Sequence, residues 1–295
     1  MTQSPTIGFI GLGLLGGAMV ERLLAQGLPV IGHDLVPDKV ERLAALGMQV
    51  GASPADIARE ADIMLLCLTT SAAVAQVVQG ERGVLSAGPG ALSLLVDHST
   101  TEIGLTRALA LRLLDEVGTA FVDAPVSGGP EAAHQGTLAI MAGGTAQAVE
   151  QARPVVGLLG RFTHMGGSGA GQATKLVNQT LVLTNYCVIA EALRLAQAHG
   201  VDPTRLVSAL ETGHAGSNLL PTLLERMIPE DFTPRGYARQ VLKDLEMLHE
   251  ASHEVNVAMP MASQALTLFR LLVAQGKGEL DGSAVISLLP RPGPG

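Results

Sequence analysis

The first half of the chain alternates short apolar runs with stretches of helical periodicity. The apolar runs predict strands over residues 6–10, 28–32, 62–68, 91–96, 119–123 and 137–142. Helices are expected over residues 16–26, from Pro37 to just before Gly47, and over residues 145–159. Strands that are apolar throughout and alternate with helices are typical of a parallel sheet covered on both faces. We therefore expect an α/β domain over residues 1–164.

The pattern changes after His164. Four closely spaced glycines predict a loop, namely Gly166, Gly167, Gly169 and Gly171. Residues 173–199 contain neither Pro nor Gly and predict one long helix. Helical periodicity continues beyond it, with breaks at 213–221, 229–236 and 276–282, and no convincing strand pattern follows. Residues 165–295 are therefore predicted to form an all-α domain.

Composition adds an expectation of self-association. Charged residues make up only 16% of the chain and hydrophobic residues 47%, whereas about 25% charged residues is usual. A chain with so little charge has less surface to expose to water, so we expect a buried interface in a homodimer or homotetramer. The net charge of −8 argues against nucleic acid and anionic membrane as partners.

Several other classes of protein are disfavoured. No apolar run reaches the ~18 uninterrupted residues expected of a membrane span. The first residues lack the basic segment of a signal peptide, so we expect a cytoplasmic protein. The two cysteines, Cys67 and Cys187, lie in apolar runs, and no His, Cys, Asp and Glu cluster has metal-ligand spacing. We therefore expect neither a disulfide framework nor a metal site.

A glycine-rich segment after the first strand carries the first candidate chemistry. Gly11, Gly13 and Gly16 fit the spacing G-x-G-x-x-G, with Leu12, Leu14 and Leu15 between them. In a dinucleotide-binding loop the first glycine permits a tight turn, the second lets the backbone approach a pyrophosphate, and the third lets helix and strand pack closely. The alternative is a structural glycine turn, but the flanking strand and helix supply the context that the motif requires. We assign residues 11–16 to the cofactor.

Asp34 bears on the choice of cofactor. It follows the second predicted strand, and its carboxylate could accept hydrogen bonds from the ribose hydroxyls of NAD. A 2′-phosphate would meet a like charge there, and the next residue, Leu35, offers no positive charge, so NAD is favoured over NADP. The alternative is a turn aspartate before Pro37. Leu68 and Thr69, at the end of the predicted strand 62–68, are also assigned to the cofactor.

Three further segments carry a family resemblance. They are Asp123-Ala-Pro-Val-Ser-Gly-Gly with Gly136-Thr-Leu-Ala-Ile-Met-Ala-Gly-Gly, then Gly169-Ala-Gly-Gln-Ala-Thr-Lys-Leu-Val-Asn-Gln, and finally Lys243-Asp244-Leu245. In this order, with the N-terminal glycine motif, the chain resembles the 3-hydroxyisobutyrate dehydrogenase (β-hydroxyacid dehydrogenase) family over nearly its whole length. The resemblance implies a Rossmann-type N-terminal domain, a long interdomain helix and an all-helical C-terminal domain. It also implies NAD(P)-dependent oxidation of a hydroxyl on a short carboxylic acid.

Two loops of the first domain are candidate ligand contacts. Ser127, Gly128 and Gly129 can present backbone N–H groups and a hydroxyl to a substrate carboxylate, although an ordinary turn has the same composition. Thr100 follows a strand end, where ligands gather in open α/β sheets. It resembles the threonine that lies beside the nicotinamide in the family, and it could equally cap the following helix.

Lys175 is the predicted proton acceptor. On the long helix it shares a polar stripe with Asn178 and Gln179, and such a stripe on an apolar helix should line a cleft or a polar interface. A partly buried lysine can hold a neutral amine that accepts the substrate's hydroxyl proton. The alternative is a solvated surface charge. The family has an asparagine three or four residues after the lysine, so Asn178 is the candidate to orient the substrate or the amine, with Gln179 in reserve.

Two positions of the second domain complete the candidate site. By resemblance Lys243 lies near the cofactor, although it could instead pair with Asp244 or Glu246. His214 is assigned to a wall of the substrate pocket, where the alternative is an exposed loop histidine. The resemblance leaves the role of Tyr237 open, because it is displaced by one position from the family's usual aromatic residue.

The sequence thus predicts an NAD-dependent dehydrogenase of small β-hydroxyacids, with Lys175 as general acid and base. Candidate substrates are 3-hydroxyisobutyrate, glycerate or tartronate semialdehyde, and threonate-like or serine-like acids. One alternative is an imine reductase, a group that tends to replace the lysine. Another is a non-catalytic NAD-binding scaffold. 6-Phosphogluconate dehydrogenase is disfavoured because the chain is shorter and no basic cluster suits a sugar phosphate.

Overall fold

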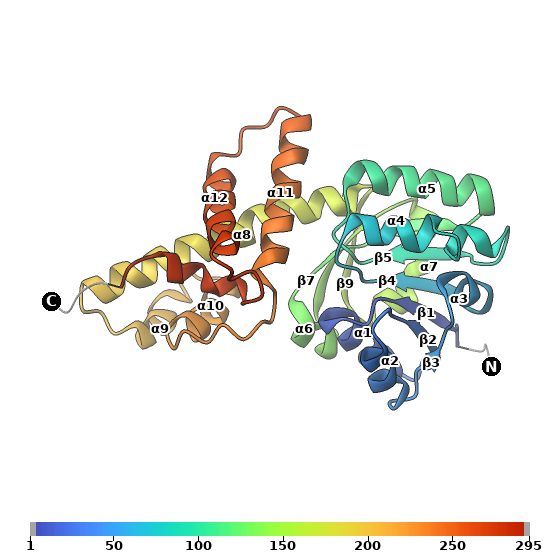
Figure 1. The fold of residues 1–295 in the computed structure, drawn as a ribbon, viewed down its shortest axis with the longest axis horizontal. Coiled ribbons are helices and arrows are strands. Elements are labelled where there is room, and N and C mark those ends of the chain that lie inside the picture. The colour runs from blue at the N-terminus through green and yellow to red at the C-terminus, as the bar shows by residue number, and fades with distance from the viewer. Residues whose placement is uncertain (1–3, 292–295) are drawn as a thin grey trace. The chain divides into compact units, whose positions relative to one another are not determined.

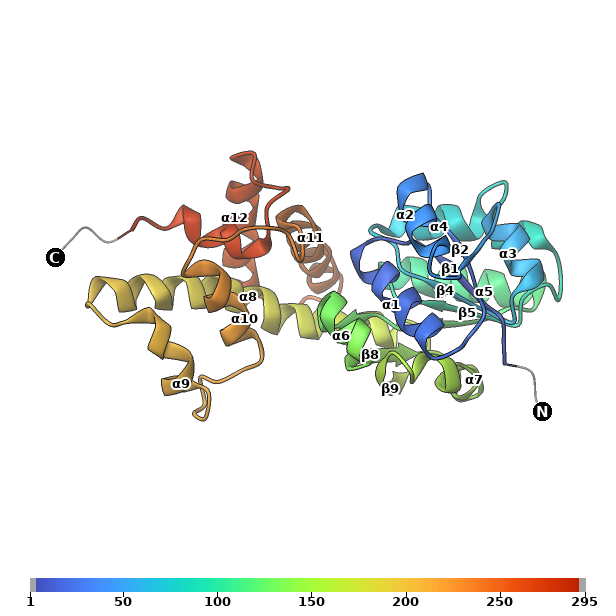
Figure 2. The same ribbon diagram turned by 90° about the horizontal axis from the view of Figure 1, so that it is seen from below.

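The computed structural model describes residues 4–291 and divides the chain into two compact units, residues 1–175 and 176–295. The expectation that the chain has no signal peptide concerns N-terminal residues that lie partly outside the described range. The boundary lies later than the predicted one at 164/165, because the last strand and the first turn of the long helix pack with the first unit. The units are described separately below, and Figures 1 and 2 locate their elements.

The first unit is built on one sheet of nine strands. They are β1 (Ile7–Ile10), β2 (Val30–His33), β3 (Gln49–Val50), β4 (Ile63–Leu66), β5 (Leu94–Asp97), β6 (Ala120–Asp123), β7 (Val126–Ser127), β8 (Leu138–Gly143) and β9 (Gly160–Gly166). Their order is β3-β2-β1-β4-β5-β6-β8-β7, with β9 also paired to β8. β1 to β6 are all parallel. The predicted α/β class is confirmed.

The prediction of a wholly parallel sheet is wrong for its last part. β8 runs antiparallel to β6 and β7, and parallel only to β9. Residues 128–137, which connect β7 to β8, are fewer than the dozen or so that a parallel crossover needs. Three strands escaped prediction. β3 and β7 have two residues each and form no recognisable apolar run, and five of the seven residues of β9 are polar or glycine.

Helices cover both faces of the sheet, as Figure 1 shows for α4 and α5 on one side and α1 and α2 on the other. In chain order they are α1 (Leu14–Ala25), α2 (Pro37–Ala44), α3 (Pro54–Glu60), α4 (Ser71–Gln79), α5 (Ile103–Val117), α6 (Gly129–Gln135) and α7 (Ala146–Val156). α1, α2, α6 and α7 pack on one face, and α3, α4 and α5 on the other.

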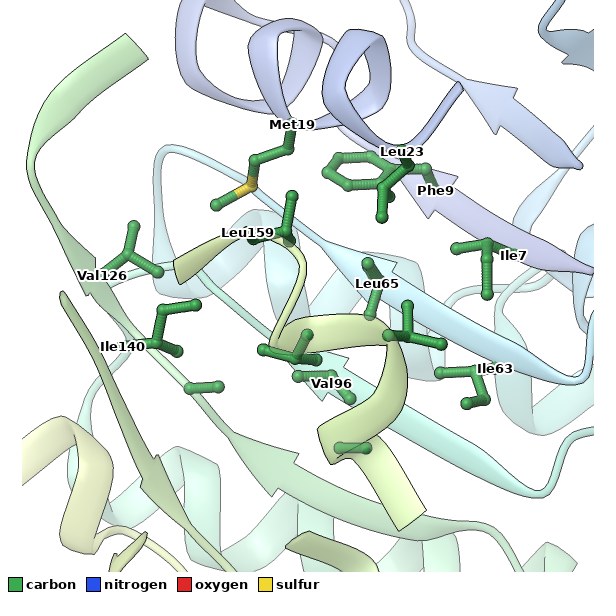
Figure 3. Close-up of a cluster of buried hydrophobic side chains, with 14 of the residues drawn as sticks. Ile7, Phe9, Met19, Leu23, Ile63, Leu65, Val96, Val126, Ile140 and Leu159 are labelled. Atoms are coloured by element: carbon green, nitrogen blue, oxygen red, sulfur yellow. The ribbon is translucent and has the colours of Figure 1, made fainter. Parts of the chain in front are cut away.

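Alternate residues of the same strand serve the two cores. Ile7 and Phe9 of β1 face the cluster beneath α1, which Figure 3 shows in close-up, while Ile10 faces the cluster beneath α3 and α4. Ile63 and Met64 of β4 divide in the same way. Because both faces are buried, every position of these strands is apolar or glycine, and this explains the continuous apolar runs in the sequence.

The long helix α8 spans Ala170–Ala198 and starts earlier than the predicted 173–199. Gly171, which was predicted to lie in a loop, lies within its first turn. A Cβ at this position would meet the carbonyl oxygens of Met141 and Asp123 at 2.4 and 2.5 Å. The glycine therefore lets the helix begin in direct backbone contact with the sheet, a tertiary effect that overrides its poor helix propensity.

The second unit contains the rest of α8 and four further helices. They are α9 (Leu206–Leu210), α10 (Leu219–Met227), α11 (Ala238–Glu254) and α12 (Pro260–Ala274), with 3₁₀ helices at Pro203–Arg205 and Gly282–Leu288. They enclose one apolar core around Leu193, Leu224, Leu245 and Phe269. Between residues 176 and 291 the described chain forms no regular strand, in agreement with the predicted all-α domain.

α8 is also the one helix of the described chain that is long and apolar enough to cross a membrane. Core helices of soluble proteins pass the same test, and 39% of its most apolar window is buried. Length and mean hydropathy are therefore weak evidence for a membrane span.

Candidate active site

Candidate ligand contacts of the first unit gather where the strand order reverses. β1 and β4 are neighbours at this switch point, and their carboxyl ends lead into the glycine loop and into Leu68 and Thr69. Ligands of open α/β sheets bind outside the carboxyl ends of the strands at such a point. The structure thus brings the loop, Asp34 after β2 and Thr100 after β5 to one edge of the sheet.

The glycine loop has the geometry that dinucleotide binding requires. Gly11 has a φ of +96°, which favours glycine, and a Cβ on Gly16 would lie 2.0 Å from its carbonyl oxygen. A Cβ on Gly13 would meet no protein atom within 4 Å, so this face of the loop is open. Gly13 precedes α1, whose N-terminus receives no side-chain cap. Free N–H groups beside an open backbone suit a pyrophosphate, and the loop therefore fits the cofactor.

The flanking leucines differ in exposure. Leu12 is buried, Leu15 is half-buried, and Leu14 is exposed at the start of α1. Because only their backbone is part of the phosphate-binding motif, their side chains are free to serve the core or to face solvent.

Asp34 organises the glycine loop. Its carboxylate accepts hydrogen bonds from the backbone N–H groups of Leu12 (2.8 Å) and Val36 (2.9 Å). The ammonium of Lys39 lies 3.4 Å away. Sequence inspection found Asp34 but missed Lys39, which stands five residues later on α2 and compensates part of the carboxylate's charge.

A buried polar turn follows β5. Asp97 is wholly buried and accepts hydrogen bonds from the Ser99 N–H (2.9 Å) and the Thr101 hydroxyl (2.7 Å). Burial raises the pKa of its carboxyl to about 6. Ser99 in turn accepts a hydrogen bond from the Leu68 N–H. Thr100 is half-buried within this turn, and Thr69 is exposed after β4.

His98 is the neutral neighbour of Asp97. Its Nδ1 lies 2.7 Å from the carbonyl oxygen of Ala124, and because a carbonyl only accepts, Nδ1 carries the proton. Burial lowers the pKa of this imidazole to about 4. Asp97 and His98 thus hold the turn that carries Thr100, and burial disfavours the charged form of both side chains.

Lys175 ends the first unit and is almost fully buried, with 7% of its surface exposed. Its ammonium nitrogen, Nζ, donates a hydrogen bond to the carbonyl oxygen of Val126 (2.9 Å) on β7. The alternative of a solvated surface lysine is therefore wrong. The carbonyl of Val126 therefore contributes to the placement of this amine.

The candidate carboxylate loop adjoins the same strand. Ser127 is the last residue of β7, Gly128 precedes α6, and Gly129 is its first residue. Ser127 is half-buried and both glycines are exposed, so hydroxyl and backbone are accessible. Because Lys175 bonds the carbonyl of the residue before Ser127, the loop and the amine lie together in the first unit.

In the second unit the candidate polar residues form one chain of hydrogen bonds. Asn178 donates its amide N–H to Gln179 (2.9 Å), and Gln179 donates to the carboxylate of Asp244 (2.5 Å). The ammonium of Lys243 lies 2.9 Å from the other oxygen of Asp244. The amide of Gln179 is therefore engaged on both sides, and its oxygen holds the NH₂ group of Asn178.

His214 and Tyr237 lie apart from this chain. His214 is exposed in the loop between α9 and α10. Tyr237 precedes α11, and the guanidinium of Arg239 stacks over its ring at 4.5 Å from the centroid.

Two family models match consecutive parts of the chain. The NAD binding domain of 6-phosphogluconate dehydrogenase matches residues 6–167, and the NAD-binding domain of NADP-dependent 3-hydroxyisobutyrate dehydrogenase matches residues 169–289. The chain is 35% identical over 290 residues to 2-(hydroxymethyl)glutarate dehydrogenase of Eubacterium barkeri, with 98% of this chain and 96% of that protein covered. It is 31% identical over 297 residues to mitochondrial 3-hydroxyisobutyrate dehydrogenase of Bos taurus, with 98% and 88% covered.

Solved structures of 3-hydroxyisobutyrate dehydrogenases have the same fold as this chain. A 3-hydroxyisobutyrate dehydrogenase from Salmonella typhimurium has a TM-score of 0.88 at 28% identity, covering 97% of this chain and all of that one. The Mycobacterium tuberculosis enzyme with L-serine has a TM-score of 0.85 at 30% identity, covering 97% and 99%. An imine reductase from Myxococcus stipitatus, at 20% identity and a TM-score of 0.64, shares the fold alone. Similarity of this extent shows that the chain belongs to the β-hydroxyacid dehydrogenase family, a family of NAD(P)-binding oxidoreductases that includes 3-hydroxyisobutyrate dehydrogenase.

Proposed function

We propose that this dehydrogenase oxidises the hydroxyl of a short β-hydroxyacid with NAD, and that Lys175 accepts the hydroxyl proton. The observation that carries the proposal is the buried Lys175 amine, held 2.9 Å from the Val126 carbonyl in the unit that carries the glycine loop. Burial disfavours a charged ammonium, and a neutral amine is the form that can take a proton.

The cofactor supplies the hydride acceptor when bound. The residues of the chain would supply binding and proton transfer: the backbone of Gly11–Gly16 would hold the pyrophosphate, Asp34 would accept hydrogen bonds from the ribose, and Thr100 would lie on the nicotinamide side. Lys175 takes the proton of the alcohol as the C–H bond breaks. In the reverse direction the same ammonium returns the proton to the carbonyl oxygen.

The substrate class follows from the carboxylate loop and from related enzymes. Ser127 and the backbone of Gly128 and Gly129 are accessible beside the strand that holds Lys175, so they can bind a carboxylate close to the amine. 3-Hydroxyisobutyrate, 2-(hydroxymethyl)glutarate and L-serine, which the names of related proteins mention, all carry a hydroxyl β to a carboxylate. We propose that this shared unit is recognised.

The test is a panel of short β-hydroxyacids with NAD and NADP, read at the nicotinamide absorbance. On the best substrate, Lys175→Ala should lower kcat by ~10²-fold or more and change NAD affinity only a few-fold. The wild-type oxidation rate should rise with pH through one deprotonation. Lys277→Ala removes a lysine that bonds Ser287 in the second unit and serves as the control.

Two results would contradict the proposal. A wild-type protein that binds NAD but oxidises no β-hydroxyacid would point to the scaffold interpretation. A Lys175→Ala variant with near-wild-type kcat would remove Lys175 from the mechanism while leaving the activity in place.

A further inference from the structure

Gln172 is a buried polar residue for which the proposed chemistry has no use. It lies one turn before Lys175 on α8, and 1% of its surface is exposed. A buried amide must have its hydrogen bonds satisfied, because an unpaired one costs about 1–3 kcal/mol. Its partners therefore indicate what the residue holds in place.

The side chain of Gln172 forms hydrogen bonds with the turn after β5 on both sides of Thr100. Its Oε1 accepts a hydrogen bond from the Thr101 N–H (3.0 Å), and its Nε2 donates one to the Ser99 carbonyl (2.9 Å). Each bond crosses about seventy residues of sequence. One amide thus fixes the backbone immediately before and immediately after the threonine assigned to the nicotinamide side.

The backbone of Gln172 is fixed at the same time by β6. The buried carboxylate of Asp123 accepts hydrogen bonds from the N–H groups of Gly169 (2.8 Å) and Gln172 (2.9 Å). These groups at a helix N-terminus have no partner within the helix, and a negative charge there is favourable. Asp123 therefore caps α8 from a neighbouring strand.

Close packing makes this arrangement rigid. A Cβ on Gly143 of β8 would lie 2.6 Å from a carboxylate oxygen of Asp123 and 2.7 Å from the Gly171 nitrogen. Asp123 is also the direct register neighbour of Asp97, which holds the same turn through Ser99 and Thr101. The start of α8 and the Thr100 turn thus meet across two adjacent strands with no room to slide.

We propose that Gln172 is a positioning residue, supported by Asp123, that holds Thr100 and Lys175 in fixed relation and so sets kcat rather than cofactor affinity. We call the pair of bonds from its side chain to Ser99 and Thr101 the Gln172 clasp. Lys175 is one helical turn further along the same rigid segment, and misplacing a reacting group by about 1 Å can lower a rate 10²-fold. The proposal rests on the proposed function for its kinetic consequence but not for the clasp itself.

Hydrogen exchange tests the clasp without any substrate. In Gln172→Leu the Thr101 N–H loses its acceptor, so its exchange should quicken at least tenfold while exchange in β1 and β4 stays unchanged. In Gln172→Glu an oxygen remains for Thr101, so protection there should persist. Unchanged Thr101 exchange in Gln172→Leu would overturn the clasp.

Kinetics test its consequence. Gln172→Leu should lower kcat by ~10- to 100-fold with KM for NAD within a few-fold. Gln172→Glu tests the same consequence with a side chain of nearly the same shape. At high pH its carboxylate cannot donate a hydrogen bond to the Ser99 carbonyl, so turnover should be slower. At low pH the protonated acid can donate this bond again. The ratio of its kcat to that of wild type should therefore rise as pH falls. Asp97, His98, Asp123 and Lys175 surround the site in both proteins, so their titrations largely cancel in this ratio.

Gln151→Glu is the matched control, because Gln151 is exposed on α7 and its side chain donates a hydrogen bond to the Ser93 hydroxyl, away from the Thr100 turn. Its kcat should match wild type at every pH. Loss of the clasp by exchange with kcat within twofold of wild type would overturn the positioning role. If wild type oxidised no hydroxyacid, the proposed function and this role would both fail, and the exchange measurement would still decide whether the clasp exists.

Discussion

The two units bury carboxylates in different ways. In the first unit Asp34, Asp97 and Asp123 follow or end parallel strands at one edge of the sheet, and each accepts two or more hydrogen bonds, most of them from backbone N–H groups. In the second unit Asp281 accepts bonds from the N–H groups of Arg235, Gly236 and Ser283 and also pairs with the buried guanidinium of Arg226 at 3.3 Å.

The two units differ in whether a buried cation neutralises the carboxylate, as Arg226 does for Asp281 in the second unit. Across the described chain neither Asp97 nor Asp123 has an ion-pair partner, and burial raises the pKa of both carboxyls. Neutral dipoles satisfy their oxygens without cancelling their charge. The first unit thus keeps uncompensated carboxylates at the edge that holds the candidate site. In the second unit Asp281 connects α10, through Arg226, and the segment before α11 to the 3₁₀ helix at Gly282–Leu288.

The comparison extends to pH. Asp97 has a folded pKa above its unfolded value of 3.8, so its contribution to stability is present at low pH and is lost as pH rises through about 6. His98 has a folded pKa below its unfolded value of 6.5, so its contribution is present above 6.5 and is lost as pH falls towards 4. The contributions of Asp97 and His98 to the free energy of unfolding therefore change in opposite directions between about pH 4 and pH 6. Their sum varies little with pH in this range.

The largest effect is expected at the buried ion pair. Arg226→Met leaves Asp281 charged and without its cation, which should lower the free energy of unfolding by about 3–5 kcal/mol. Arg226 also donates to the carbonyl of Thr233, so the loop before α11 should loosen with it. Urea unfolding followed by circular dichroism measures the loss.

Two further variants make this test specific. Arg226→Met with Asp281→Asn removes the stranded charge and should recover part of the loss. Arg205→Met breaks an exposed pair with Asp202 in the same unit and should change stability little. If the single Arg226→Met variant were as stable as wild type, the buried carboxylate of the second unit would not need its cation, and the proposed difference between the units would be wrong.

The next effect concerns Asp97. Asp97→Asn removes the charge that burial opposes and leaves His98 in place, so the variant should become more acid-sensitive than wild type. Its stability relative to wild type should fall by about 1.5 kcal/mol between pH 8 and pH 5, and by up to about 3 kcal/mol below pH 4. Urea midpoints at several pH values measure this difference.

The control for that experiment is Asp115→Asn, which changes an exposed carboxylate on α5 of the same unit. Its stability relative to wild type should not vary with pH in the same way. Parallel pH curves for Asp97→Asn and wild type would contradict the assignment of the raised pKa to burial of this carboxyl.

Much of this contrast is invisible in the sequence, although the elements are not. Strands such as 62–68 and 119–123 were predictable because both faces of the sheet are buried, and the glycine loop because its spacing reflects backbone geometry. Asp123 was visible within a motif, but its partners lie 46 and 49 residues later. Gln172 also lies within a quoted motif but received no role, because a glutamine is usually solvated, and only the folded chain shows it buried.

The third prediction concerns surfaces. Val177, Leu181, Val188 and Leu195 lie on one face of α8 and are 47–64% exposed within the described chain, spaced so that they form a stripe. We expect a second copy of the chain to cover this stripe. Leu181→Lys should then weaken self-association by ~10- to 100-fold, because burying one leucine is worth about 1.5–3 kcal/mol. Light scattering across a dilution series measures the change.

The control for self-association lies in the other unit. Leu114 on α5 is 56% exposed, so Leu114→Lys makes the same chemical change away from the stripe and should leave the oligomer intact. A wild-type species of about 30 kDa at micromolar concentration would overturn the expectation, as would equal effects of the two substitutions.

The smallest effect is expected at Asp34, the one carboxylate of this edge that has a nearby cation. Asp34→Ala should raise the ratio of kcat/KM for NADP over NAD by about tenfold, since a charged hydrogen bond is worth about 1.5–3 kcal/mol. Part of the change should come from poorer use of NAD, because the Leu12 N–H loses its acceptor. Lys39, released from its pair, should attract the 2′-phosphate, so adding Lys39→Met should reverse part of the gain. A wild-type enzyme that prefers NADP would show instead that Lys39 already outweighs Asp34.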